Sequence, residues 1–135
     1  MENCVFCKII KGELPCVKIY DDEYTFAFLN LNPVNQGHSL VIPKNHSEQL
    51  LLNHNGDIHH VMDTIRKIVP AIIKAVNANG WNLQVNNGKA AGQVIFHTHF
   101  HIIPRFDNDN FKKWPHKEAS VEEREKIRDR ILEEL

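Results

Sequence analysis

Hydrophobic residues recur every three or four positions between residues 57 and 80, and this spacing predicts the longest helix of the chain. Asp57 is expected to cap the N-terminus of this helix, and Gly80 is expected to close it. Pro70 falls inside the segment, where it should remove one backbone hydrogen bond and kink the helix. The apolar stripe that faces the core consists of Ile58, Val61, Met62, Ile65, Val69, Ile72, Ile73 and Val76.

Short segments rich in β-branched and aromatic residues predict strands on either side of the long helix. We expect strands over residues 17–20, 24–31, 38–42, 81–86 and a last one that contains the histidine-rich segment and runs to residue 104. Strands arranged around one long helix favour an α+β fold with a mainly antiparallel, five-stranded sheet. The length of 135 residues fits a single domain over residues 1–135.

Three shorter helices are also expected. One starts near Cys4 and ends near Gly12, because glycine commonly follows the last residue of a helix. A second covers residues 48–53 after a possible Ser47 cap. The third is the C-terminal helix, which begins with a capping box of Ser120 and Glu123. Its charges are mixed, as is typical of a solvated helix, and its apolar side consists of Val121, Ile127, Ile131 and Leu135.

Composition excludes several classes of function. A formal net charge of −1 gives no basic field for nucleic acid. No apolar run approaches the length of a membrane span, and the N-terminus lacks a signal-peptide pattern, so we expect a cytoplasmic protein. Nine histidines in so short a chain favour metal binding or acid–base chemistry.

The three cysteines do not suggest a disulfide framework. Cys4 and Cys7 form a CxxC motif, but no strand precedes it, so a thioredoxin-like redox site is disfavoured. Half of a zinc site is the better interpretation, and a closed structural site would need two further ligands from distant histidines. Cys16 has no partner in this scheme and is expected to act as a small buried hydrophobe.

His97, His99 and His101 alternate with Thr98 and Phe100. In a strand the three imidazoles would share one face, and packing alone does not explain such a row. Three kinds of chemistry remain open: a catalytic zinc site, an anion-binding module, and covalent catalysis at phosphorus. The row cannot chelate one ion by itself, because its outer members would lie roughly 13 Å apart.

The segment over residues 97–104 resembles the histidine triad motif. Over nearly its whole length the chain is similar to the bacterial Hint-like branch of the histidine triad (HIT) superfamily. It extends over residues 4–10, 27–29, 37–38, 41–44, 86–87, 92–93 and 103–105. This resemblance implies a homodimer that hydrolyses or transfers nucleotidyl groups from purine nucleoside 5′-phosphoramidates or acyl-nucleotides.

The resemblance also implies a role for individual residues. His99 would be the nucleophile, held by a backbone carbonyl at Nδ1 so that Nε2 stays free. His101 would bind the α-phosphate, and His38 would support the row. An apolar slot for the base would include Val5, Phe6, Ile9, Leu14, Phe28 and Leu31. Other contacts to the nucleotide would come from Asn30, Asn86, Gly92, Gln93 and Val94.

Two positions depart from the family pattern. Asn30 stands where an aspartate usually binds ribose, and Val94 stands where many relatives have serine. These departures leave open a nucleotide-binding or scaffolding module with little turnover. Within the superfamily, the alternative activity is hydrolysis of dinucleoside polyphosphates. The resemblance further implies a structural zinc ion, and its ligands would be Cys4, Cys7, His46 and His97.

Overall fold

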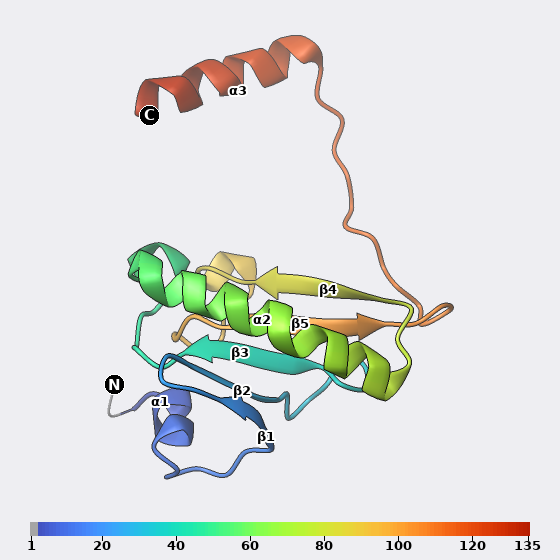
Figure 1. Cartoon of the computed structure of the whole chain (residues 1–135). Helices are drawn as coiled ribbons and strands as arrows, with labels where there is room; N and C mark the ends of the chain where they lie inside the picture. The colour runs from blue at the N-terminus through green and yellow to red at the C-terminus, as the bar shows by residue number, and fades with distance from the viewer. Residues whose placement is uncertain (1–2) are drawn as a thin grey trace.

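The computed structural model describes residues 3–135 as a five-stranded sheet with helices on both faces (Figure 1). All four ladders are antiparallel, and the strand order is β1-β2-β3-β5-β4. The sequence prediction of an α+β fold with an antiparallel five-stranded sheet is confirmed. The strands are β1 (Lys18–Asp21), β2 (Thr25–Leu29), β3 (Ser39–Pro43), β4 (Gly80–Val85) and β5 (Phe100–Arg105).

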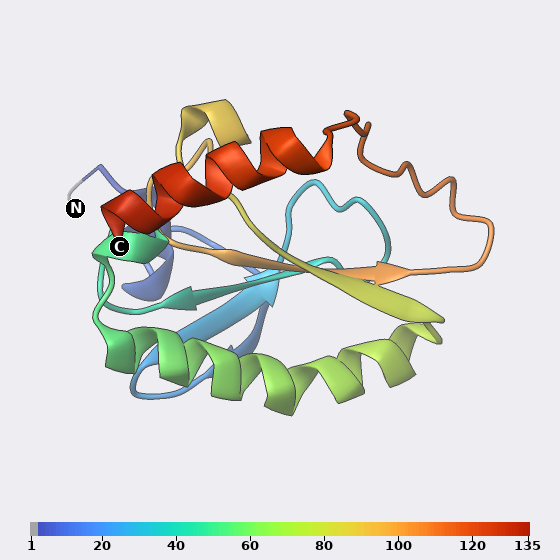
Figure 2. The ribbon, with the colours of Figure 1, turned by 90° about the horizontal axis from the view of Figure 1, so that it is seen from above.

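The long helix α2 (Asn55–Val76) covers one face of the sheet. Its stripe packs on the central strands, where Val41 and Ile102 are fully buried. The short helix α1 (Val5–Ile10) lies on the opposite side and brings Phe6 and Ile9 to a second core cluster (Figure 2). That cluster also contains Phe26, Phe28, Leu40 and Ile42.

The ends of α2 differ from the sequence prediction. His54 is the N-cap, and Asp57 lies inside the first turn, where its carboxylate accepts a hydrogen bond from the Asn45 amide at 3.1 Å. The helix ends at Val76 because Asn77 adopts a left-handed conformation with φ 55°, which asparagine tolerates better than most residues. Gly80 instead begins β4. The helix continues through Pro70 without interruption.

Two other boundaries were also misplaced. The predicted helix over residues 48–53 is a single 3₁₀ turn, η1 (Leu50–Leu52), and its cap is Gln49 rather than Ser47. The histidine-rich strand starts only at Phe100, so His97 and His99 lie in the segment that leads into β5. A second 3₁₀ turn, η2 (Lys89–Ala91), precedes that segment.

The C-terminal helix α3 (Val121–Glu134) stands apart from the rest of the molecule (Figure 1). Its predicted capping box is present, with the Glu123 amide donating to Ser120 Oγ and the Ser120 amide donating to the Glu123 carboxylate. All of its residues are exposed. Within residues 3–135, no helix is long and apolar enough to cross a membrane.

Candidate active site and metal cluster

The histidine site lies where the two central strands meet on the α1 side of the sheet. Leu40 of β3 pairs with His101 of β5, and His38 immediately precedes β3. Phe6 of α1 lies edge-on against the ring of His99, with the ring centroids 5.2 Å apart. The sheet register and α1 together therefore bring residues distant in sequence to one site.

His99 is held in one orientation by the backbone. Its Nδ1 lies 2.7 Å from the carbonyl oxygen of His97, so Nδ1 carries the proton and donates to this oxygen. In the neutral ring Nε2 then has a free lone pair. Burial lowers the pKa of His99, although the same carbonyl bond opposes the shift. The ring is thus neutral at pH 7, as a nucleophile requires.

His38 and His101 form a chain of hydrogen bonds with a defined direction. The backbone amide of Val34 donates to His38 Nδ1 at 3.0 Å, so the proton of neutral His38 is on Nε2. His38 Nε2 lies 2.9 Å from His101 Nδ1 and donates to it. His101 then carries its own proton on Nε2, where it is a hydrogen-bond donor for an anion.

Both rings of this chain remain neutral at pH 7. Burial, followed by the neighbouring His99 and His38, lowers the pKa of His101 to about 4. Burial also lowers the pKa of His38. The hydrogen bonds from Val34 to His38 and from His38 to His101 therefore keep the same donors and acceptors at neutral pH.

Asn30 lies beside this chain. Its Nδ2 is 3.2 Å from His38 Nε2, and its Oδ1 accepts a hydrogen bond from the Asn32 amide at 3.0 Å. The predicted ribose contact is thus a neutral amide next to the supporting histidine.

The loop before the histidine row is held by Gln93. This side chain is almost fully buried, its Oε1 accepts from the Gly88 amide at 2.8 Å, and its Nε2 donates to the carbonyls of Glu48 and Ile95. Gly92 adopts φ 89°, a conformation that L-residues rarely take. Asn86 accepts a hydrogen bond from Gln84 and faces the same loop. The geometry gives Gln93 a part in fixing the loop.

The residues predicted for a base slot are divided between core and surface. Phe6, Ile9 and Phe28 are buried together, whereas Val5 and Leu14 are partly exposed. Leu31 is 91% exposed, and Val94 is also exposed. Their predicted contacts with a nucleotide remain predictions.

Cys4, Cys7, His46 and His97 converge at the N-terminal turn of α1. One ligand atom from each lies within 4.8 Å of the others. The His97 Nδ1 atom is 3.5 Å from Cys4 Sγ, 3.6 Å from Cys7 Sγ and 3.2 Å from His46 Nδ1, and Cys7 Sγ is 3.4 Å from His46 Nδ1. Zn–S and Zn–N bonds of 2.3 and 2.0–2.1 Å place neighbouring ligand atoms of a tetrahedron about 3.3–3.8 Å apart. The four side chains are therefore placed to coordinate one ion with tetrahedral geometry.

Pro43 orients His97 for this cluster, a role that sequence reasoning missed. Its carbonyl accepts from His97 Nε2 at 2.8 Å, which leaves the lone pair of Nδ1 directed at the two sulfurs. Val34, which orients His38, was missed for the same reason, because a backbone group leaves no signal in the residue type.

The remaining four histidines stay outside both groups. His54, His59 and His116 are exposed, and His60 stacks on Tyr24 with ring centroids 3.7 Å apart.

Comparison with known proteins agrees with this geometry. Residues 11–108 match the HIT domain. The chain belongs to the HIT family. It is 50% identical over 107 residues to adenylylsulfatase HINT3 of Arabidopsis thaliana, covering 79% of this chain but only 54% of that protein. It is 38% identical to an adenosine 5′-monophosphoramidase of Schizosaccharomyces pombe, covering 90% of both chains.

Two solved structures extend the comparison. A crystal structure from Streptococcus mutans matches with a TM-score of 0.93 and 37% identity, covering 99% of this HIT chain and 86% of that one. A zinc-bound histidine triad family protein from Mycobacterium smegmatis matches with a TM-score of 0.77 and 32% identity, covering 99% of both chains.

Proposed function

We propose that this HIT protein hydrolyses purine nucleoside 5′-phosphoramidates or acyl-nucleotides through a covalent intermediate on His99. The supporting observation is the 2.7 Å bond from His99 Nδ1 to the His97 carbonyl, which leaves Nε2 unprotonated and available for attack. Relatives named adenosine 5′-monophosphoramidase and adenylylsulfatase support the same class of substrate.

The reaction proceeds in two displacements. His99 Nε2 attacks the α-phosphorus, the bond from phosphorus to the leaving nitrogen or oxygen breaks, and the leaving group departs with a proton where its basicity requires one. Water then attacks the same phosphorus, the Nε2–P bond breaks, and the nucleoside monophosphate leaves. The proton lost by water replaces the one taken by the leaving group, and His99 returns to its neutral form.

The surrounding residues stabilise the charge that develops on the phosphoryl oxygens. His101 donates from Nε2, and His38 fixes the tautomer that makes this possible. Gln93 holds the glycine-containing loop that approaches the phosphate. Asn30 meets the ribose, and the base rests against the apolar residues near Phe6.

Transfer of label from substrate to protein tests this proposal. Adenosine 5′-phosphoramidate labelled at phosphorus is mixed with the full chain and the reaction is quenched with denaturant. Wild type should retain label, and His99→Asn should retain none and lose at least about 10³-fold in kcat. His116→Asn, an exposed histidine of the same type, is the matched control and should behave as wild type.

The alternatives give different outcomes in the same assay. Faster turnover of a dinucleoside tetraphosphate than of the phosphoramidate would favour polyphosphate hydrolysis. Tight binding of adenosine monophosphate with no label on wild type would favour a binding or scaffolding module and would refute covalent catalysis.

We also propose that Cys4, Cys7, His46 and His97 hold a structural zinc ion. The distances between the ligand atoms match a zinc tetrahedron, and a histidine triad neighbour is zinc-bound. With four protein ligands such an ion has no open position for substrate, so it ties α1 to the segment before β5 and takes no part in the chemistry.

The third part of the proposal is a homodimer paired through β4. This strand is one edge of the sheet and carries neither a charged residue nor a proline to block pairing. Trp81 and Leu83 are both partly exposed on one face of the strand. Trp81 borders an open apolar groove whose other lining residues are Arg66, Val69, Pro70 and Ile73.

A further inference from the structure

The chain turns back on itself after β5, and one carboxylate organises this turn. Asp109 accepts a hydrogen bond from Arg105 Nη2 at 2.7 Å and another from the Phe106 amide at 2.9 Å. Its side chain is only 8% exposed. The bond from Arg105, followed by the one from the Phe106 amide, lowers the pKa of Asp109, so the carboxylate is charged at pH 7. Asn108 and Asn110 adopt left-handed conformations on either side of it, which asparagine tolerates.

The same carboxylate reaches the loop that precedes β3, which covers residues 30–38. The side-chain amide of Asn35 donates to Asp109 Oδ2 at 2.8 Å and to the Pro104 carbonyl at 2.9 Å. These groups meet because β3 and β5 are antiparallel neighbours, so the start of one strand lies beside the end of the other (Figure 1). Arg105, Asp109 and Asn35 therefore form one hydrogen-bonded network that ties the turn after β5 to this loop.

That loop carries the group that decides the tautomer of His38. Asn35 immediately follows Val34, whose amide donates to His38 Nδ1 at 3.0 Å. The Asn35 carbonyl also accepts from the His38 amide at 3.1 Å. An anchored Asn35 therefore holds the Val34 amide against the imidazole ring.

The opposite tautomer of His38 also has a partner in this structure. Asn30 Nδ2 lies 3.2 Å from His38 Nε2 and can donate to it whenever Nε2 is unprotonated. In that form the proton of His38 is on Nδ1, and His101 must donate from its own Nδ1 to His38 Nε2. His101 Nε2 is then a bare acceptor, which repels phosphoryl oxygens. The hydrogen bond from the Val34 amide is what disfavours this form.

We propose that Asp109 is a positioning residue for the hydrolysis: through Asn35 it holds the loop before β3 in the conformation in which the Val34 amide selects the active tautomer of His38. The inference rests on the proposed role of His101 as the donor to the phosphate. Asp109 acts from a distance, because each group in this series fixes only the next one.

The fold should survive loss of the Asp109 carboxylate. Gly37 packs closely on Pro104, and a Cβ atom at this glycine would lie 3.2 Å from the Pro104 side chain. The backbone amide of Asn30 also donates to the His38 carbonyl at 2.8 Å. These contacts hold the end of the loop next to β3, so loss of the carboxylate loosens the first half of the loop without detaching the strand.

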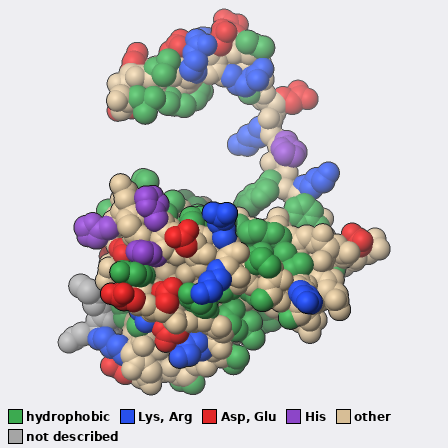
Figure 3. Space-filling model, viewed as in Figure 1, with side chains coloured by type: hydrophobic (Ala, Val, Ile, Leu, Met, Phe, Trp, Pro, Cys, Tyr) green, Lys and Arg blue, Asp and Glu red, His purple; other side chains and the backbone are tan. Residues whose placement is uncertain are grey.

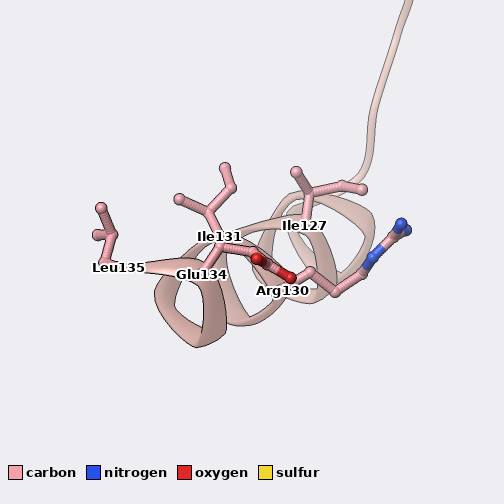
Figure 4. Close-up of a pocket in the computed structure, with 5 residues that line it drawn as sticks. All are labelled: Ile127, Arg130, Ile131, Glu134 and Leu135. Atoms are coloured by element: carbon pink, nitrogen blue, oxygen red, sulfur yellow. The ribbon is translucent and has the colours of Figure 1, made fainter.

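Helix α3 is not needed for this network. Figure 3 shows α3 separated from the body of the molecule, and its apolar side chains border an open hollow on the helix itself (Figure 4). Phe111 lies against Arg105, with 4.8 Å between the guanidinium carbon and the ring centroid. The network is therefore complete within residues 30–111.

The ring nitrogens of His38 report the tautomer directly. Long-range proton–nitrogen correlation spectra of the full chain with isotope-labelled histidine, recorded at pH 7 without substrate, distinguish a protonated ring nitrogen from a bare one. A His38→Asn sample identifies the signals of this residue, and wild type should carry the proton on Nε2. Asp109→Ala should shift the tautomer ratio toward Nδ1 about three- to tenfold, which is the effect of losing one hydrogen bond of ordinary strength. Asp107→Ala, the same change at an exposed aspartate of the same turn, is the matched control and should leave the His38 signals unchanged.

A second variant separates this route from a loss of folding. Asn35→Ala removes the contact with the loop but leaves Asp109 paired with Arg105, and it should shift the His38 tautomer in the same direction. Asp109→Ala should add less than about twofold in that background, because residues that act through one network are not additive. In each single variant kcat/KM should fall by the same factor as the fraction of free enzyme with His38 protonated at Nε2, because only that fraction reacts.

The proposal is overturned by an unchanged His38 tautomer in the two folded single variants, by an equal shift in Asp107→Ala, or by the full effect of Asp109→Ala in the Asn35→Ala background. The spectra involve no turnover, so they decide the role of Asp109 separately from the labelling assay that decides covalent catalysis.

Discussion

At the scale of single residues, backbone groups decide what each histidine can do. The sequence predicted that a carbonyl would hold His99, and the His97 carbonyl has the corresponding position. It did not predict which group would do so, nor that the Val34 amide would set the tautomer of His38. Such groups are the same in every residue type and become visible only when the chain is folded.

The amide at position 30 leads to a prediction about ribose. Asn30→Asp replaces a neutral contact with a charged acceptor, and charge-assisted hydrogen bonds are roughly twice as strong as neutral ones. We expect the variant to bind adenosine monophosphate about three- to tenfold more tightly by calorimetry. A 2′,3′-dideoxy analogue lacks the hydroxyls and should show no gain, and an equal gain for both ligands would contradict the ribose assignment.

The low pKa of His101 predicts how stability changes with pH. Its pKa falls from an ordinary 6.5 to about 4 in the folded chain. Between these values the unfolded chain binds more protons, so the stabilisation present above pH 6.5 is lost as pH falls toward 4. Urea titrations should show that the free energy of unfolding falls less steeply over this window in His101→Asn than in wild type. The exposed control His116→Asn should keep the wild-type slope.

At the scale of elements, periodicity identified the helices and strands, but local chemistry decided their ends. The stripe of α2 was evident, whereas its last residue depended on Asn77 accepting a left-handed conformation three residues before the expected Gly80. The alternating histidines predicted a strand that included His97 and His99, but β5 begins only at Phe100, where its pairing with β4 starts. The length of a hydrogen-bonded strand depends on both of the segments that pair, so the sequence of one segment does not show where the strand begins.

The metal cluster leads to a prediction about helix α1. Cys4→Ser removes one of four ligands and should reduce bound zinc well below one per chain, measured by elemental analysis after purification. It should also lower the free energy of unfolding by about 3 kcal/mol, because ion binding stabilises only the folded form. Cys16→Ser is the matched control, since Cys16 lies outside the cluster. Absence of zinc from wild type would refute the metal assignment.

At the scale of the whole molecule, the family could be recognised from the spacing of a few motifs. The arrangement of α3 could not be anticipated in the same way. Its capping box predicted a helix, but the sequence of a helix does not show what covers it. The sequence predicted a strand over residues 81–86, but the position of this strand at the edge of the sheet became evident only in the fold.

The edge strand leads to a prediction about assembly. Leu83→Lys places a charge on β4, which is how natural edge strands avoid pairing. The variant should sediment closer to the 15.6 kDa of a single chain, whereas wild type should sediment at twice that mass. Leu52→Lys makes the same change at an exposed leucine away from β4 and should remain dimeric.

The two roles of His97 connect the cluster of Cys4, Cys7 and His46 with the imidazole of His99. Its ring faces the sulfurs of Cys4 and Cys7, and its carbonyl, in the same residue, fixes the imidazole of His99. A chelator or a thiol oxidant that displaced the N-terminal turn would therefore shift His97, and the His99 imidazole would lose the orientation that it needs to attack phosphorus.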